Sequence, residues 1–315
     1  MSRALLIVLV LASTARAWSE SGHHIVALLA YDRLQGAEQT ALVTLLESHP
    51  RYAEDFQPPE KIANRTRWRV GVLGYWPDIA RHQPAYNRPK WHYHLGANFV
   101  IGDRSKVKVP AQAWQLPEFA TLDTKDLHIA QAIKLCFRVA SDKSQSASDR
   151  AIALSWVAHL VGDAHQPCHS GSLYAESVFP DGDRGANTIK VKQSGNLHAL
   201  WDGLLGGRVE EGDVNRRLAS IATDDALHEL ATRADDPEVV LPGVWLDESE
   251  RYALLCVYSK EVLQTVKAVQ RGLTEEMPVI NLSDKYLEIA GRVARMRAYQ
   301  AGIRLAKLWR AILQD

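Results

Sequence analysis

The carboxyl-terminal part of the chain contains two long segments with the apolar periodicity of amphipathic helices. They cover residues 248–272 (ESERYALLCVYSKEVLQTVKAVQRG) and 287–313 (LEIAGRVARMRAYQAGIRLAKLWRAIL). Apolar stripes of this length are usually buried against other helices, so we interpret both as core and not as part of a ligand site. The two segments favour a mainly α fold.

Three earlier segments also have helical spacing: residues 22–34, 37–49 and 149–165. In the third, Ser148 is a suitable N-cap and Pro167 brings the helix to an end. Most of the chain is therefore expected to be helical.

Two regions lack this periodicity, residues 96–118 and 170–195. Within the second, TIKVK (residues 188–192) is typical of a short strand in a hairpin. No repeat or low-complexity linker divides the sequence. We predict one mainly α domain with a small β-hairpin region.

Residues 1–17 have the three parts of a secretory signal peptide. Arg3 supplies the positive start, ALLIVLVLA the apolar middle, and ARA, directly before Trp18, the small-residue cleavage site. The apolar run is shorter than the ~18 residues that a membrane-spanning helix needs. We expect residues 18–315 to form the mature domain, secreted or periplasmic and without a membrane anchor; the alternative is a retained anchor.

The charge balance and the cysteine count limit other interpretations. Lysine plus arginine and aspartate plus glutamate both number 37, so no overall positive field attracts nucleic acid, and phosphate binding would need a local charge. Apolar residues make up 46% of the chain, which is enough for a large core. Cys136, Cys168 and Cys256 allow at most one intramolecular disulfide, and the sequence does not indicate which pair would form it.

Two segments carry a histidine and an aspartate four positions apart. HLVGD contains His159 and Asp163, and HALWD contains His198 and Asp202. On a helix such a pair projects from one face, so both side chains can reach one divalent ion, and zinc suits a mixed nitrogen and oxygen set. One pair alone is more often a packed or surface histidine. Two pairs, one followed by HQPCH with His169, favour a metal site.

A third acidic residue and two histidines lie between aromatic residues. Asp78 follows a Trp-Pro pair in GYWPDIAR, an unusual place for a carboxylate unless a cation shares the site. In KWHYHLG, His92 and His94 alternate with aromatic residues, so an extended segment would place both on one face. The spacing alone does not decide whether His92 or His94 is a ligand.

Taken in order, WSESGH, WPDIAR, WHY, HLVGDAHQPCH, DRGAN and NLHALWD resemble the trinuclear-zinc single-strand nucleases of fungi, plants and bacteria, also called type I nucleases or 3′-nucleotidases. The resemblance covers nearly all of residues 18–315 and implies a helical domain that binds three Zn²⁺ ions. The zinc-dependent phospholipases C share that scaffold. The ligands implied for the first zinc are Asp78, His92, His159 and Asp163; for the second, His169, His198 and Asp202; for the third, Trp18 through its own amine and carbonyl, His23, and the shared Asp163.

The implied function is hydrolysis of single-stranded DNA or RNA, and of 3′-nucleotides, to 5′-phosphate products by metal-activated hydroxide. The resemblance implies that Asp78 orients the nucleophile and that Arg81 contacts the phosphate. It also implies that Tyr93 stacks on a base and that Asp183 and Asn187 position the substrate. The alternatives are that Tyr93 is an ordinary core tyrosine and that Asp183 and Asn187 serve only their turn. No protein partner is implied.

Two positions depart from the fungal pattern, so the resemblance implies metal binding more directly than base recognition. Leu95 stands where fungal members often have an acidic residue, and Ala186 replaces a glycine. Three other functions remain open: a phospholipase C-type phosphodiesterase, a 3′-nucleotidase without polymer activity, and a zinc-binding protein without catalysis.

Overall fold

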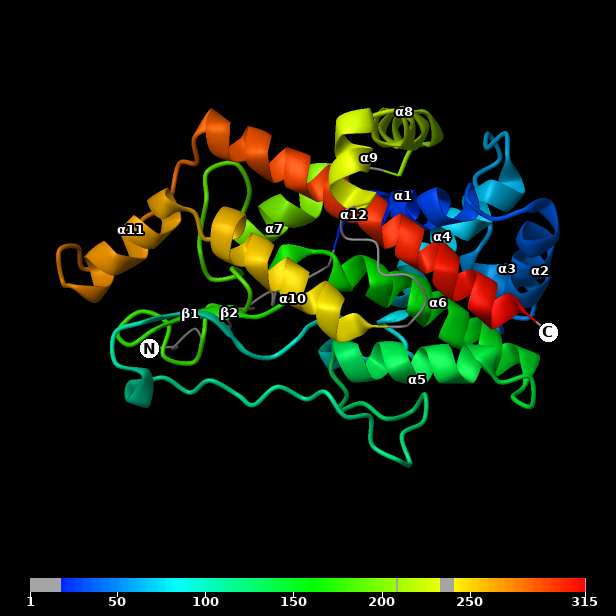
Figure 1. Ribbon diagram of the computed structural model, residues 1–315, viewed down its shortest axis with the longest axis horizontal. Coiled ribbons are helices and arrows are strands. Elements are labelled where there is room, and N and C mark those ends of the chain that lie inside the picture. The colour runs from blue at the N-terminus through cyan, green and yellow to red at the C-terminus, as the bar shows by residue number, and fades with distance from the viewer. Residues whose placement is uncertain (1–17, 208, 233–240, 315) are drawn as a thin grey trace, which may run out of the picture.

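The computed structural model describes residues 18–207, 209–232 and 241–314 (Figure 1). The predicted signal segment lies outside these residues, so its assignment stays a prediction. Within them helices dominate, and the mainly α fold class is confirmed. The α-helices are α1 (Glu20–Tyr31), α2 (Gly36–Glu47), α3 (Tyr52–Asp55), α4 (Arg65–Ala80), α5 (Ile129–Ser141), α6 (Ala147–Ala164), α7 (Leu197–Asp202), α8 (Glu211–Ala222), α9 (Asp225–Thr232), α10 (Pro242–Tyr252), α11 (Lys260–Gln270) and α12 (Asp284–Leu313).

Shorter elements connect the helices. They are the 3₁₀ turns η1 (Pro89–His92), η2 (Arg104–Lys106), η3 (Pro167–His169) and η4 (Gly203–Leu205), the π-helical turn η5 (Ala253–Val257), and the strands β1 (Ala97–Ile101) and β2 (Ser172–Ala175).

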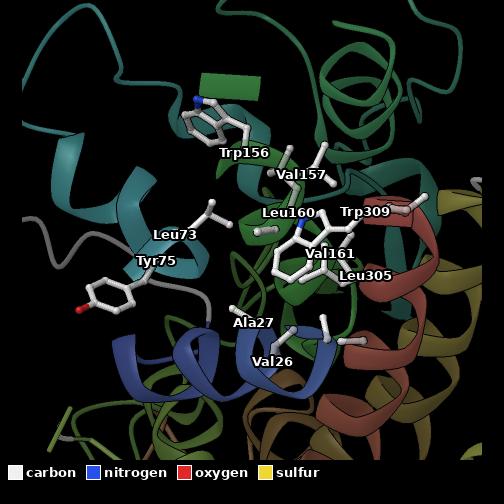
Figure 2. Close-up of a cluster of buried hydrophobic side chains, with 14 of the residues drawn as sticks. Val26, Ala27, Leu73, Tyr75, Trp156, Val157, Leu160, Val161, Leu305 and Trp309 are labelled. Carbon is white, nitrogen blue, oxygen red and sulfur yellow. The ribbon is translucent and has the colours of Figure 1, made fainter. Parts of the chain in front are cut away.

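The main core lies where α1, α4, α6 and α12 pack together. Figure 2 shows apolar side chains from these four helices converging, and each of the labelled ones from α6 and α12 is almost completely buried. The 30-residue α12 runs obliquely across the molecule and packs against α1 and α6 (Figure 1). The residues that fill this core are Val26, Ala27, Leu73, Trp156, Val157, Leu160, Val161, Leu305 and Trp309.

Two helix boundaries differ from those that the sequence predicts. The N-cap of α6 is Ser146, whose side chain accepts a hydrogen bond from the Asp149 amide, and not Ser148. The segment 248–272 is not one helix, because α10 passes into η5 and α11 begins again after Ser259, which caps it. Apolar spacing continues across this break, so the periodicity could not reveal it.

The helix α4 is absent from the elements that the sequence predicts. Most of its residues from Val70 to Asp78 are buried, so it has no polar face to create an apolar stripe. Pro77 also lies within its last turn, where proline normally argues against a helix. A central helix therefore has a weaker sequence signal than the amphipathic helices around it.

The predicted β-hairpin is wrong. The two strands β1 and β2 are parallel and come from separate regions, with Ala97 opposite Ser172 and Ile101 opposite Ala175. Residues 188–192 contribute only isolated bridges, from Val191 to Ser194 and to Ile280. Because β1 follows η1 and β2 follows η3, the pairing brings the ends of these two turns together, and the His94 amide donates to the His169 carbonyl at 2.8 Å.

Among the described helices, none is both long enough and apolar enough to cross a bilayer.

Candidate metal centre

The carboxylate of Asp163, at the end of α6, is the centre of the site. It is completely buried, and three histidine nitrogens surround it. His23 Nε2 lies 3.2 Å from Oδ1, His92 Nδ1 lies 3.0 Å from Oδ2, and His159 Nε2 lies 3.4 Å from Oδ2. These side chains come from α1, η1 and α6, so the packing of three separate segments creates the group.

Two further groups complete the arrangement. Asp78, from α4, joins His92 and His159, and its carboxylate is paired with Arg81. The third group is His169, His198 and Asp202. His169 Nε2 lies 3.2 Å from His198 Nε2, which lies 3.5 Å from Asp202 Oδ2. In each group, one ligand atom per residue falls within 4.8 Å of the others, and every member is buried.

The eight side chains that the family resemblance implied as ligands thus meet in three groups. The ninth residue, Trp18, is fully buried, and the amide of its neighbour Ser19 donates to the Asp202 carbonyl at 2.9 Å. The hydroxyl of Ser21 donates to the Gly206 carbonyl at 2.5 Å, just after η4. These hydrogen bonds therefore hold the first described residues close to Asp202, a candidate ligand.

Backbone carbonyls orient three of the histidine rings. Nδ1 of His159 donates to the Gly74 carbonyl at 3.0 Å, Nδ1 of His198 to the Gly185 carbonyl at 2.5 Å, and Nδ1 of His169 to the His92 carbonyl. With a proton on Nδ1, the lone pair of each ring is on Nε2, the atom that faces the group. This arrangement is typical of histidines that bind metal.

The protonation states also suit a metal. Burial lowers the pKa of His159 to about 3, and it lowers the pKa of His169 as well, so both rings are neutral at pH 7. Burial would raise the pKa of Asp163, but His159, His23 and His92 outweigh it and hold the pKa well below its usual value. Neutral imidazole and ionised carboxylate are the forms that bind divalent ions.

Several atoms that could bind a metal at the centre lack a hydrogen bond among the described residues. Within the described residues, His23 Nε2, Asp163 Oδ1 and Asp78 Oδ2 are buried and make no hydrogen bond of normal geometry, although the first two atoms lie 3.2 Å apart. Buried polar atoms are normally satisfied, so their convergence on common points requires another group to satisfy them. Divalent cations fit this donor set of imidazole nitrogens and carboxylate oxygens.

Close packing of α1 against α6 places His23 in the centre. Gly162 precedes Asp163, and a Cβ at this position would lie 2.6 Å from His23 Nδ1. A side chain there would push the ring away from Asp163. The helix therefore needs glycine at this point despite its conformational cost.

We accordingly expect Gly162→Ala to displace His23 and weaken metal retention about tenfold, since changes next to ligands typically cost that much. Metal content after dialysis, measured by mass spectrometry, tests this. Gly291→Ala is the matched control, because Gly291 is also inside a helix but has no atom within 4 Å of a Cβ. The control should keep its metal and gain about 0.5–1 kcal/mol of unfolding free energy. Equal metal retention in both variants would show that Gly162 does not position His23.

Neighbouring polar residues that the motifs did not identify support the centre. Gln166 is fully buried; its Nε2 donates to Asp202 Oδ1 at 2.7 Å and its Oε1 accepts from the Cys168 amide at 2.5 Å.

A second polar network lies behind the centre. His165 turns away from the centre, and Arg304 donates to its Nε2 at 2.8 Å. Arg297 and Arg304 both pair with Glu248, joining α12 to α10. Because Arg297 and Arg304 are seven residues apart within the apolar stripe of α12, the sequence could have indicated a buried ion-pair network there.

The structure distinguishes His92 from His94. The segment is not extended, since η1 ends at His92 and turns this ring toward Asp163. His94 instead packs on Trp114, with ring centroids 4.2 Å apart. Trp91 is buried, whereas Tyr93 is 37% exposed. The segment is therefore not the extended strand that was expected. His92, the ligand implied by the resemblance, is the histidine that reaches Asp163.

The residues predicted to contact substrate have different positions. The Tyr93 ring is partly exposed and makes an edge contact with His128, with centroids 5.7 Å apart. Asn187 donates to the Arg184 carbonyl. Asp183 is completely buried and accepts from the Leu173 amide at 2.9 Å, so the alternative, a role in its own turn, is favoured. The substrate contact that the resemblance implies for Asp183 stays a prediction.

The cysteines form no disulfide: all three belong to the described residues and are free. Cys168 belongs to an apolar cluster with Leu173 and Leu197, and burial raises its thiol pKa well above the usual value. Packing therefore accounts for it better than metal binding.

Buried histidine–aspartate groups of this kind in a helical fold fit a metal-dependent hydrolase. A comparison with protein families identifies the particular one: the S1/P1 nuclease description matches residues 18–314, and the chain belongs to that family. The chain is similar to Endonuclease 1 of Arabidopsis thaliana, with 24% identity over 98% of this chain and 92% of the relative. The chain is also similar to Endonuclease 2 of the same plant, with 26% identity over 92% of this chain and 88% of that relative. The resemblance found in the motifs is thus confirmed, and membership supports a metal-dependent nuclease.

Proposed function

We propose that this chain is an exported zinc-dependent endonuclease that hydrolyses single-stranded DNA or RNA and leaves 5′-phosphates. The observation that carries the proposal is the convergence of eight buried histidine and aspartate side chains in three groups around and beside Asp163. Zinc is the ion that suits mixed imidazole and carboxylate ligands best, and each group would hold one ion, with the Trp18 amine completing the group of His23.

When bound, zinc ions lower the pKa of water and neutralise the phosphate. Three divalent ions against the carboxylates of Asp78, Asp163 and Asp202 would leave a local positive surplus in a chain without overall charge excess. The chain supplies the geometry. Asp163 is held ionised, and the carbonyls of Gly74 and Gly185 keep two rings aimed at the centre.

Arg81 connects the centre with the surface. Its side chain is 17% exposed, whereas that of its partner Asp78 is 2% exposed. The guanidinium therefore reaches from a buried carboxylate toward solvent, where it can donate charge-assisted hydrogen bonds to a phosphate oxygen. Asp78 in turn accepts from Arg81 and can orient the attacking water through its other, orphaned oxygen.

A preference for single strands would arise from stacking. An unpaired base can lie on an aromatic face, and such contacts tolerate many sequences. Tyr93 directly follows the candidate ligand His92 and has an exposed ring, so it is suitably placed. Because the relatives that match are endonucleases, we favour nucleic acid over phospholipid as the substrate.

The test compares four substrates on zinc-loaded protein that begins at Trp18: a single-stranded oligonucleotide, its duplex, a 3′-mononucleotide, and phosphatidylcholine micelles. We expect the single strand to be cleaved faster than the duplex, with 5′-phosphate ends by mass spectrometry. A chelator should abolish cleavage and zinc should restore it. Cleavage of phosphatidylcholine alone, or of the mononucleotide alone, would assign the alternative functions. Export is tested separately by sequencing the amino terminus of protein collected outside the cytoplasm.

A further inference from the structure

The turn at residues 184–186, next to the group of His169, His198 and Asp202, has an unusual backbone. The φ angle is 59° at Arg184, 61° at Gly185 and 68° at Ala186, so three consecutive residues are left-handed. Residues other than glycine rarely adopt this conformation, and surrounding contacts must hold it. At residue 185 only glycine fits, because a Cβ would lie 2.3 Å from the Cys168 carbonyl oxygen.

This turn holds His198. The Gly185 carbonyl accepts from His198 Nδ1 at 2.5 Å, and the Ala186 carbonyl accepts from the His198 amide at 3.3 Å. The first contact fixes the tautomer of the ring and its direction, and the second fixes the start of α7. A right-handed backbone at residues 184–186 would aim these carbonyls elsewhere and release the ring.

Two buried side chains, those of Asp183 and Tyr258, connect the segment just before this turn with the elements packed around it. Asp183 Oδ1 accepts from the Leu173 amide at 2.9 Å and from the Tyr258 hydroxyl at 3.1 Å. Burial raises the pKa of Asp183 to about 6, while the amides of Ala186 and Leu173 and the Tyr258 hydroxyl act in the opposite direction. Tyr258 is 1% exposed and follows the π-helical turn η5, so the end of α10 is linked through Asp183 to the turn.

We propose that Asp183 and Tyr258 are positioning residues for the metal centre: together they hold the left-handed turn at residues 184–186, so that the Gly185 carbonyl keeps the His198 ring directed at His169 and Asp202. The inference rests on the proposed metal centre and does not depend on which substrate is cleaved. It gives Asp183 a function that its burial allows.

The test uses Tyr258→Phe, which removes one hydroxyl, and Asp183→Asn, which keeps the size but replaces an oxygen with a donor. Tyr252→Phe is the matched control, because this tyrosine packs nearby and its hydroxyl contacts only Met296 Sδ, at 3.6 Å, among the hydrogen bonds of the described residues. Each protein is dialysed against a zinc buffer set by a competing chelator, and zinc per chain is measured by mass spectrometry. In zinc-free protein, long-range ¹H–¹⁵N spectra report the tautomer of His198.

We expect both variants to bind one zinc equivalent about 10–100-fold more weakly, with the remaining equivalents unchanged. The His198 spectrum should change from the Nδ1-protonated form to a mixture, while Tyr252→Phe behaves like the parent. Unchanged zinc affinity in Tyr258→Phe and Asp183→Asn would overturn the proposal. So would equal weakening of all equivalents together with a lower melting temperature, because that pattern indicates a general loss of structure. A parent protein that binds zinc but cleaves no nucleic acid would refute the proposed function and leave these readouts intact.

Discussion

Asp163→Asn is expected to lower nuclease activity about a thousandfold or more, since each bound ion contributes several kcal/mol of transition-state stabilisation. The reason is that His23, His92 and His159 all lie within 3.4 Å of this one carboxylate. An amide has one neutral oxygen and a donor in place of two charged oxygens, so it cannot serve two ions. Zinc content should fall by two equivalents, while the group of His169, His198 and Asp202 keeps its own.

Asp149→Asn is the matched control for this change. Asp149 lies in the first turn of the same helix α6, is exposed, and accepts a hydrogen bond from the Ser146 hydroxyl. The control should keep full zinc content and activity, with at most a small loss of helix stability. Circular dichroism shows whether Asp163→Asn remains folded, and Asp163→Glu, which keeps the charge, should recover part of the zinc. Full zinc content in Asp163→Asn would mean that this residue does not hold the ions.

Adding one residue before Trp18 is expected to remove at least one zinc equivalent and to slow single-strand cleavage about a hundredfold or more, equal to about 2.7 kcal/mol. A free α-amine has a pKa of ~7.7–8.0, so a metal can displace its proton near neutral pH. The extension converts this amine into a peptide nitrogen, which does not bind zinc under these conditions. Trp18 is fully buried, and the amide of the next residue, Ser19, donates to the Asp202 carbonyl, so this end of the described chain lies close to the candidate ligands.

The comparison needs protein with a defined first residue, verified by intact-mass measurement. The control carries the same extra residue after Asp315, at the other end of the chain, and should match the parent in zinc content and rate. Equal zinc and equal rate in the two extended proteins would refute the amine as a ligand. Loss of zinc without loss of activity would show that the third ion is not needed for cleavage.

The sequence was sufficient for the candidate ligands because their signals are local. A histidine and an aspartate four residues apart on a helix share a face wherever that helix is placed, which is why His159 with Asp163 and His198 with Asp202 were identified correctly as pairs that meet. The long stripe of α12 and the mainly α class followed from periodicity for the same reason.

Where the sequence failed, the deciding contacts were between distant segments. The parallel pairing of β1 with β2 replaced the predicted hairpin, because strand partners are chosen by the packing of η1 and η3 and not by a local turn. The helix α4 has no apolar stripe because it is buried on most sides. The contacts of Asp183 with Leu173 and Tyr258 likewise join distant segments, and the motif gave no sign of them.

By itself, then, the sequence determined which residues are candidate ligands and that the pairs His159 with Asp163 and His198 with Asp202 lie on helices, since both depend on side-chain type and on spacing within a few turns. Only the tertiary structure decided that His23, His92 and Asp78 meet at Asp163, that His92 and not His94 is turned inward, and that Gly162, Gln166 and the turn at residues 184–186 hold the ligands in place. These outcomes depend on the close approach of segments separated by tens of residues, and spacing along the chain does not encode such distances.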